Sequence, residues 1–314
     1  MTNIPRVDIL LSTYNGSRYL PEFFQSIARQ THHNWKLLIR DDGSTDGTIS
    51  EIVAFSKEFP DKVMFNKANI EHIGVLQSYS QIALLSSSKY IMFADQDDVW
   101  LPGKISMTLD AIIRMEKTST TPVPLLVHTD LMVVDDSLFV MAESFWIEEN
   151  LNPGNSQSFL LQLTQNYVTG CTIMVNRALL DMALPFPEKA VMHDWWLVLV
   201  ANAFGAVQYL PRATILYRQH ANNVVGATPK GSARLMRVIQ KIIDMRGSVG
   251  RSEAQAKEFY CRYKGSNAAT SCISDAFAYG SIRSHNSFYR MVIALRHGFR
   301  KGSLLRTIGL YISL

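Results

Sequence analysis

The amino-terminal third of the chain alternates between short apolar runs and longer segments with a helical pattern. The apolar runs cover residues 7–12, 35–40, 63–66 and 90–94. The segments between them have helix-compatible spacing, at residues 19–30, 48–59 and 75–86. Strands that alternate with helices build a mostly parallel sheet with helices on its faces. The sequence therefore predicts an α/β fold around such a sheet.

Shorter elements of both kinds follow. Further strands are expected at residues 125–130, 133–140, 172–175 and 214–218, and helices at residues 158–165 and 193–203. From residue 230 onward the pattern is helical to the end. A chain of 314 residues that is 47% apolar can bury the core of one large α/β domain and carry a helical appendage.

Charge is distributed unevenly along the chain. Residues 1–227 contain 16 basic and 23 acidic side chains, whereas residues 228–314 contain 15 basic and only 4 acidic ones. The Gly- and Pro-containing stretch GATPKG, residues 226–231, marks the change. We therefore predict two parts, an α/β domain at residues 1–227 and a basic helical region at residues 228–314.

The start of the chain and its cysteines indicate the compartment. A strand-like run begins at Val7, without the basic and apolar segments of a signal peptide. The strongly apolar, uncharged stretch at residues 195–210 has 16 residues and is too short for a spanning helix. Three scattered cysteines, Cys171, Cys261 and Cys272, fit neither a disulfide framework nor a zinc site. We expect a cytosolic protein in which these cysteines serve packing.

Polar motifs follow three of the predicted strands. STYNG follows the first strand, DDGSTDG the second and DQDD the fourth. Ligands of open α/β sheets bind outside the carboxyl ends of the strands, so these motifs should meet at one edge. The edge is the expected binding site.

Asp95, Asp97 and Asp98 place three carboxylates within four residues. One of them could cap the helix expected near Leu101 and Pro102. Three carboxylates that converge repel one another unless a cation compensates them, and Mg²⁺ or Mn²⁺ prefers oxygen ligands and bridges to phosphate. We favour a divalent metal that arrives with a phosphorylated substrate.

The first two motifs suggest a nucleotide pocket. Turn chemistry alone can explain the glycines of DDGSTDG and Asp41, but it explains Asp42 less well. A carboxylate at a strand end can accept a hydrogen bond from a base or a ribose. Thr13, Tyr14 and Asn15 offer a hydroxyl, an aromatic face and an amide beside it.

HDWW opens the helix expected at residues 193–203. Asp194 is either a first-turn anion favoured by the helix dipole or a general base, with Trp195 and Trp196 forming a wall that positions an acceptor. His220 is either a surface histidine or a contact to the metal or diphosphate. Cys171 lacks an evident partner base and is interpreted as a core residue.

Together these motifs resemble the inverting family 2 nucleotide-sugar glycosyltransferases, which have a GT-A type fold. The resemblance extends over residues 7–225 and is carried by ILLSTYNGSRYLPEFFQSIARQT, LLIRDDGSTDGT, FADQDDVW, TGCTIMVNR and HDWW. In DQDDVW, HDWW and YRQHANNVVG the chain is most similar to the bacterial rhamnosyltransferase branch, which builds cell-surface polysaccharides. The motifs do not cover the region after residue 230.

The resemblance implies roles for the motif residues. Asp97 would be the principal ligand of Mg²⁺ or Mn²⁺, Asp95 would contact the ribose or the metal, and Asp98 would assist. Asp194 would deprotonate the acceptor hydroxyl, although His193 stands where many relatives have Glu. Around the base and ribose the resemblance places Thr13, Tyr14, Asn15 and Asp42.

The implied reaction is transfer of a sugar, with L-rhamnose from dTDP-L-rhamnose as first choice, to a glycan or lipid-linked acceptor. The same mechanism with a UDP-hexose donor is the alternative, and a non-catalytic membrane-associated adaptor is the alternative of a different class. A nucleotidyltransferase or a phosphoaspartyl enzyme would need other motifs after the first strand. The basic, apolar helices near the carboxyl terminus are predicted to contact either a membrane surface or a second subunit of a homo-oligomer. No nucleic-acid partner is expected.

Overall fold

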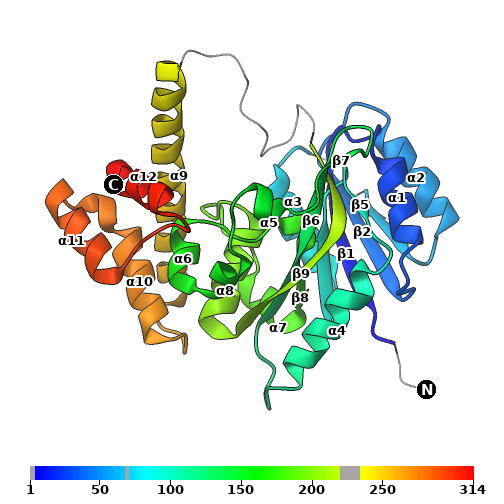
Figure 1. Cartoon of the computed structure of the whole chain (residues 1–314). Coiled ribbons are helices and arrows are strands. Elements are labelled where there is room, and N and C mark those ends of the chain that lie inside the picture. The colour runs from blue at the N-terminus through cyan, green and yellow to red at the C-terminus, as the bar shows by residue number, and fades with distance from the viewer. Residues whose placement is uncertain (1–3, 68–70, 220–233) are drawn as a thin grey trace.

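The computed structural model describes residues 4–67, 71–219 and 234–314, and it describes the side chains of the last range from residue 246 onward. Its strands form one curled mixed sheet with helices on both faces and a group of helices beside it (Figure 1). Among these residues, no helix is both long enough and apolar enough to cross a membrane.

The amino-terminal half of the sheet is parallel, as the sequence predicts. Four strands lie side by side in the order β3 (Val63–Asn66), β2 (Trp35–Asp41), β1 (Val7–Thr13) and β4 (Tyr90–Ala94). Parallel strands are buried on both faces and read as continuous apolar runs. This is why the sequence pattern located them.

The second half of the sheet has mixed pairing. Strand β8 (Met174–Asn176) runs antiparallel to β4 and to β6 (Leu125–Val134). Next to β6 lies the parallel strand β9 (Ala206–Arg218), which pairs with the short antiparallel strand β5 (Val99–Trp100). The hairpin partner of β6 is β7 (Val140–Ala142). The sheet is therefore parallel over β1 to β4 and mixed beyond β4.

Alternate residues of β1 belong to two different cores. Ile9 and Leu11 pack on one face and Leu10 on the other. The first face is covered by α1 (Leu20–Ala28), α2 (Thr48–Glu58) and α4 (Lys104–Glu116). The second face is covered by α3 (Val75–Leu85), α7 (Arg177–Ala183) and α8 (His193–Phe204). Two short helices, α5 (Phe145–Glu148) and α6 (Phe159–Thr164), lie in the connection between β6 and β8.

The carboxyl-terminal helices pack against α6 and α8 (Figure 1). They are α9 (Arg234–Tyr263), α10 (Thr270–Gly280), α11 (Ser287–His297) and α12 (Leu304–Ser313). The ring of Trp196 on α8 lies 5.8 Å from Phe259 and 6.0 Å from Tyr263 of α9, measured between ring centroids. The helical region thus shares a hydrophobic core with the second face of the sheet.

Candidate active site

The carboxyl ends of β1, β2 and β4 meet at one edge of the sheet. The register pairs Thr13 of β1 with Asp41 of β2, and Leu11 of β1 with Ala94 of β4. The three polar motifs therefore leave the sheet side by side. The hydroxyl of Thr13 donates to Asp41 over 2.9 Å, and both residues are buried.

Tyr14 joins the loop after β1 to the DQDD motif. Its amide donates to Gln96 Oε1 over 2.9 Å, and Gln96 Nε2 donates back to the Tyr14 carbonyl over 2.9 Å. The Tyr14 side chain is 49% exposed, and its ring lies 5.0 Å from that of His72. Because its backbone is held by Gln96 and its ring is half exposed, Tyr14 offers an aromatic surface on which a planar group can stack.

Asn15 joins the same loop to the loop after β2. Its backbone adopts φ 47°, a left-handed conformation that asparagine tolerates better than most residues. Its amide donates to Ser44 Oγ over 2.8 Å, and its Oδ1 accepts from the Thr45 amide over 2.9 Å. In this arrangement Asn15 organises the two loops.

Asp42 is buried in a dense set of hydrogen bonds. Its carboxylate accepts from Arg40 over 2.6 Å, from the amides of Ile73 and Gly74 over 2.9 and 3.0 Å, and lies 3.0 Å from His72 Nδ1. Arg40 is fully buried and also donates to the Glu71 carbonyl. The predicted contact of Asp42 with base or ribose stays a prediction, since the structure shows Asp42 holding the segment that includes His72 beside Tyr14.

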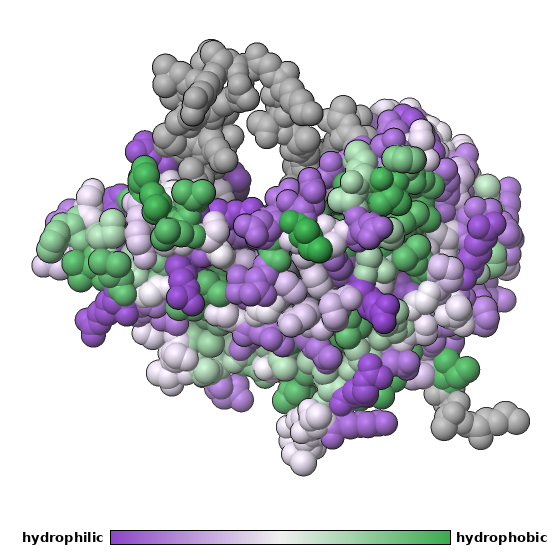
Figure 2. Space-filling view, viewed as in Figure 1, coloured by the Kyte–Doolittle hydropathy of each residue, from purple (hydrophilic) through white to green (hydrophobic). Residues whose placement is uncertain are grey.

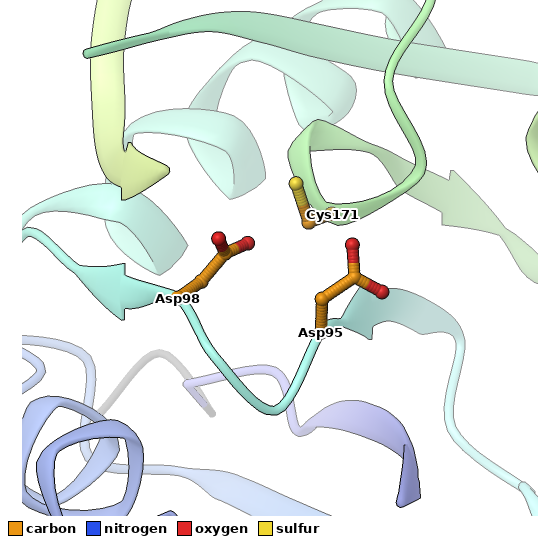
Figure 3. Close-up of side chains that lie close together, drawn as sticks. All are labelled: Asp95, Asp98 and Cys171. Atoms are coloured by element: carbon orange, nitrogen blue, oxygen red, sulfur yellow. The ribbon is translucent and has the colours of Figure 1, made fainter. Parts of the chain in front are cut away.

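Asp95, Asp98 and Cys171 converge at the end of β4. One ligand atom from each lies within 4.8 Å of those of the other two. Figure 3 shows Asp95 and Asp98 on either side of Cys171, each with a carboxylate oxygen turned toward it. Both oxygens of Asp98 are buried and have no hydrogen-bond partner among the described residues. Unpartnered carboxylate oxygens that converge in this way fit a hard divalent cation.

The pKa values at this edge reflect buried negative charge. Burial, followed by the charge of Asp97, raises the pKa of Asp95 to about 6. The same two causes raise the pKa of Asp98 well above its usual range. Lys104 is the nearby cation, but burial lowers its pKa to about 8, and its ammonium lies over the Trp100 ring without a hydrogen-bond acceptor among the described residues. The compensation by Lys104 is therefore incomplete.

Asp97 is not part of the converging group. It is partly exposed, and its carbonyl accepts a hydrogen bond from Arg218 over 3.2 Å. Arg218 also bonds Glu22 and the Asp136 carbonyl, so it fixes the DQDD turn between α1 and the β6–β7 hairpin. Asp97 lies close enough to raise the pKa values of Asp95 and Asp98. Its assignment as principal metal ligand stays a prediction.

Asp194 lies in the first turn of α8 and is 7% exposed. Burial raises its pKa to about 7, with the Trp195 amide opposing and the charge of Asp95 adding to the increase. A carboxylate with a pKa near neutrality suits general base catalysis. The 3₁₀ turn Gly170–Thr172 lies between Asp194 and the pair of carboxylates, Asp95 and Asp98. Its Cys171 belongs to the converging group at the end of β4. Its Gly170 has no side chain and so leaves room for Asp194 and His193.

His193 is buried and uncharged. Burial lowers the pKa of His193 to about 3, and neither ring nitrogen has a hydrogen-bond partner among the described residues. Its ring lies 4.3 Å from Tyr79 and 4.7 Å from Phe93. His193 therefore packs beneath the site as an aromatic ring.

The two tryptophans of HDWW were expected to form a wall for the acceptor, but both are largely buried. Trp196 is fully buried, and its indole nitrogen donates to the Ala183 carbonyl over 3.1 Å. It has no surface left for an acceptor, because α9 covers it. Trp195 is 7% exposed, and its indole nitrogen donates to the Gln162 carbonyl. The predicted role of Trp195 in positioning an acceptor stays a prediction. His220 lies outside the described residues.

Three residues that the sequence did not single out support the site. Arg40 binds Asp42, Tyr79 binds Asp95, and Arg218 binds the DQDD turn. Tyr79 lies in a helix among polar neighbours and Arg40 in an apolar strand, and in neither case does the sequence indicate the partner of the side chain. The one sequence feature that could have identified Arg40 is a charged residue within an apolar strand, because such a residue is rarely buried without a partner.

The chain matches the sequence profile described as "Glycosyl transferase family 2" over residues 8–181. This match covers more than half of the chain and includes all three strand-end motifs and the Gly170–Thr172 turn. The chain belongs to glycosyl transferase family 2.

Curated relatives and solved structures agree with this family. The dTDP-rhamnosyl transferase RfbG of Shigella flexneri is 26% identical over 240 residues, 73% of this chain and 78% of that protein. The glucosyltransferase WfgD of Escherichia coli, whose full name is UDP-Glc:alpha-D-GlcNAc-diphosphoundecaprenol beta-1,3-glucosyltransferase, is 24% identical over 203 residues, 64% of this chain and 72% of that protein.

Two solved structures share the fold. The mannosyltransferase PcManGT from Pyrobaculum calidifontis, in complex with GDP-Man and Mn²⁺, superposes with a TM-score of 0.54 at 15% identity and covers 99% of this chain and 80% of that one. S. aureus TarS 1–349, in complex with UDP-GlcNAc, superposes with a TM-score of 0.51 at 14% identity and covers 98% of this chain and 90% of that one. The GT-A type fold expected from the sequence is confirmed.

Proposed function

We propose that this glycosyltransferase transfers L-rhamnose from dTDP-L-rhamnose to a hydroxyl of a cell-surface or lipid-linked glycan, with inversion at the anomeric carbon. The observation that carries the proposal is the placement of Asp194, with a pKa raised to about 7, across the Gly170–Thr172 turn from the Asp95 and Asp98 carboxylates. A base and a set of metal-binding oxygens at one sheet edge are what a single displacement on a nucleotide sugar requires.

The donor would occupy the edge formed by the loops after β1 and β2. Tyr14 would stack on the base, because its backbone is fixed by Gln96 and its ring is exposed. Thr13, Asn15 and Asp42 would shape the pocket around base and ribose, with Asp42 holding His72 beside Tyr14.

Asp97, with Asp95 and Asp98, would hold Mg²⁺ or Mn²⁺ against the diphosphate. The metal would supply Lewis-acid stabilisation of the charge that develops on the leaving nucleoside diphosphate. Burial, followed by the charge of Asp97, raises the pKa values of Asp95 and Asp98, and this supports the role, because a bound cation would stabilise both carboxylates in their ionised form.

Asp194 would accept the proton of the acceptor hydroxyl. As that oxygen forms its bond to the anomeric carbon, the bond from the anomeric carbon to the diphosphate breaks, and the electron pair leaves with the nucleotide. General bases of this kind accelerate reactions about 10²–10⁴-fold. Buried surroundings protect the step from water.

The choice of rhamnose is supported by the similarity to RfbG, whose name specifies a dTDP-rhamnosyl transferase. A UDP-hexose donor is the second candidate, supported by WfgD, whose name specifies UDP-Glc and a diphosphoundecaprenol-linked acceptor. With either donor, residues 1–227 would form the catalytic domain and residues 228–314 a helical region that positions it. The enzyme would act in the cytoplasm.

A panel of nucleotide sugars tests the proposal. Purified protein is incubated with each donor, with Mg²⁺ or Mn²⁺ or with EDTA, and with a lipid-linked saccharide as acceptor. We expect nucleoside diphosphate release that needs metal and is fastest with dTDP-L-rhamnose. Faster turnover of a UDP-hexose would replace rhamnose by the second candidate. Metal-independent transfer with every donor would contradict the role given to the carboxylates.

A further inference from the structure

Helices α11 and α12 are apolar on two sides. Their inner sides are packed, with Ala294 and Leu310 fully buried beside Phe299. Their outer sides are exposed and still apolar. A helix on the surface of a protein normally turns polar residues toward water, so an apolar outer side calls for a partner.

The outer side chains form stripes at helical spacing. On α11 the stripe consists of Phe288 (73% exposed), Met291 (37%), Val292 (43%) and Leu295 (62%). On α12 the exposed fractions are 77%, 82%, 45% and 59%, for Leu304, Leu305, Ile308 and Ile312. Figure 2 shows apolar surface gathered over both helices on the same side of the molecule. Together these eight residues are the outer stripe.

The outer stripe is held as one unit on the rest of the protein. Arg290 of α11 donates to the carbonyl of Leu314, which follows α12. Thr164 of α6 donates to the Arg300 carbonyl over 2.6 Å, which anchors the connection between α11 and α12. Arg306 of α12 donates to the Glu149 carbonyl over 2.9 Å, next to α5. The two helices are therefore a fixed surface and not a loose end.

Basic residues lie in the same segment of the chain as the stripe. From Phe277 to Leu314 the chain has six basic residues and no Asp or Glu. Arg296 and Arg300 are exposed and form no ion pair within the part of the chain that the structure describes. Helices with apolar side chains flanked by Lys and Arg lie in the interface of anionic membranes.

We propose that the outer stripe and its flanking arginines dock on an anionic lipid bilayer. Charge decides between this partner and a second copy of the chain. A twofold dimer through the same surface would place each basic segment against itself, and like charges brought together across an interface oppose association. An anionic bilayer is complementary to both the apolar and the basic component.

Acidic residues next to α12 limit the extent of the proposed bilayer contact. The contact from Arg306 to Glu149 ties α12 to α5, whose cap residue Ser144 donates to Asp130 in β6. Exposed acidic residues, Glu143, Glu148 and Glu149, gather at α5, so the bilayer contact ends there. The outer stripe, and not α5, would therefore face the lipid.

Co-sedimentation with vesicles tests the charge component. The full-length protein is mixed with phosphatidylcholine vesicles that contain either no anionic lipid or about one third phosphatidylglycerol. We expect sedimentation only with the anionic vesicles, weakening as salt is added. Arg296→Gln/Arg300→Gln should weaken it about 25-fold, because each basic residue at such a surface contributes roughly a fivefold factor. The control Lys57→Gln/Arg114→Gln removes the same charge from exposed sites on α2 and α4 and should bind like the wild type.

A second pair of variants tests the apolar component. Leu304→Ser/Leu305→Ser should reduce binding to anionic vesicles at least tenfold, since these side chains would enter the interface. Leu84→Ser/Leu85→Ser, at exposed positions 65% and 45% accessible at the end of α3, should leave binding unchanged. Absence of vesicle binding by the wild type would overturn the inference. So would a wild-type dimer in analytical ultracentrifugation that Leu304→Ser/Leu305→Ser converts to monomer. Neither result depends on the identity of the donor sugar.

Discussion

The hydroxyl of Tyr79 lies 3.2 Å from Asp95 Oδ1 and donates to the Ala94 carbonyl over 2.7 Å. Tyr79 is 1% exposed and comes from α3, which covers the second face of the sheet. It therefore fixes the point where β4 ends and the carboxylate motif begins. The hydrogen bond from the Tyr79 hydroxyl to Asp95 also favours the ionised form of Asp95. It lowers the pKa of Asp95, whereas the larger effect of burial raises it.

Tyr79→Phe should weaken metal use without unfolding the protein. Losing a hydrogen bond to a charged group costs about 1.5–3 kcal/mol, so the Mn²⁺ concentration for half-maximal activity should rise roughly tenfold or more. Titration of activity with Mn²⁺ measures the change. Tyr90→Phe is the matched control, because its hydroxyl bonds Glu116 over 2.8 Å at the far end of the same strand. An unchanged Mn²⁺ dependence in Tyr79→Phe would show that Tyr79 only packs.

Asp97→Asn should separate activity from stability. Transfer should fall by two or more orders of magnitude if Asp97 holds the metal on the diphosphate. The same change removes a charge that raises the pKa values of Asp95 and Asp98, so repulsion in the metal-free protein should decrease. We therefore expect a thermal midpoint in EDTA equal to or above that of the wild type. Near-wild-type transfer would contradict the metal assignment, and a lower midpoint would indicate a structural role.

Asp194→Asn should remove the general base and keep the donor site. Binding of the nucleotide sugar, measured by calorimetry, should persist while transfer falls about 10²–10⁴-fold. In the wild type, kcat should decline as pH falls through about 7, where Asp194 becomes protonated, and this decline should be absent from the residual activity of the variant. Parallel loss of binding and transfer would make Asp194 structural.

The same group makes a prediction for stability. Burial raises the folded pKa of Asp194 to about 7, above the ordinary value of 3.8, so the folded state binds the proton more tightly than the unfolded state. This contribution is complete below pH 4 and is lost as pH rises toward 7. The free energy of unfolding of Asp194→Asn, measured with urea, should therefore gain on the wild type between about pH 4 and pH 7, the window set by the two pKa values.

The sequence was most informative where strands are buried on both faces. β1, β2 and β4 consist of continuous apolar runs, and their ends were located within a residue or so. β6 was expected as two strands, at residues 125–130 and 133–140, but it runs without a break over Leu125–Val134 and carries three polar residues, His128, Thr129 and Asp130. All three are buried, and they bond Ser156, Thr214 and Ser144, which are distant in the chain. Pattern alone cannot supply those partners.

The site was predictable only in part for a similar reason. Strand ends placed Thr13, Asp42 and Asp95 at one edge, because topology determines where parallel strands finish. The contacts that give each carboxylate its properties come from other elements, such as Tyr79 on α3 and Cys171 in a 3₁₀ turn. Trp196 was misassigned because exposure depends on α9, a helix beyond the motif-bearing part of the chain.

Gly170→Ala should lower kcat through the geometry around the general base. A Cβ at residue 170 would lie 2.7 Å from His193 Nε2 and 3.5 Å from Asp194 Oδ2. The His193 ring packs tightly against Tyr79 and Phe93, so the start of α8 must shift and carry Asp194 with it. Because catalysis is sensitive to displacements of about 1 Å, we expect kcat to fall on the order of 10²-fold. Donor affinity, measured by calorimetry, should change little, since Tyr14 and the loop after β2 are untouched. Gly103→Ala provides the control, because a Cβ there meets no atom within 4 Å, and its kcat should equal that of the wild type. A Gly170→Ala enzyme with unaltered kcat would show that the placement of Asp194 does not limit the reaction.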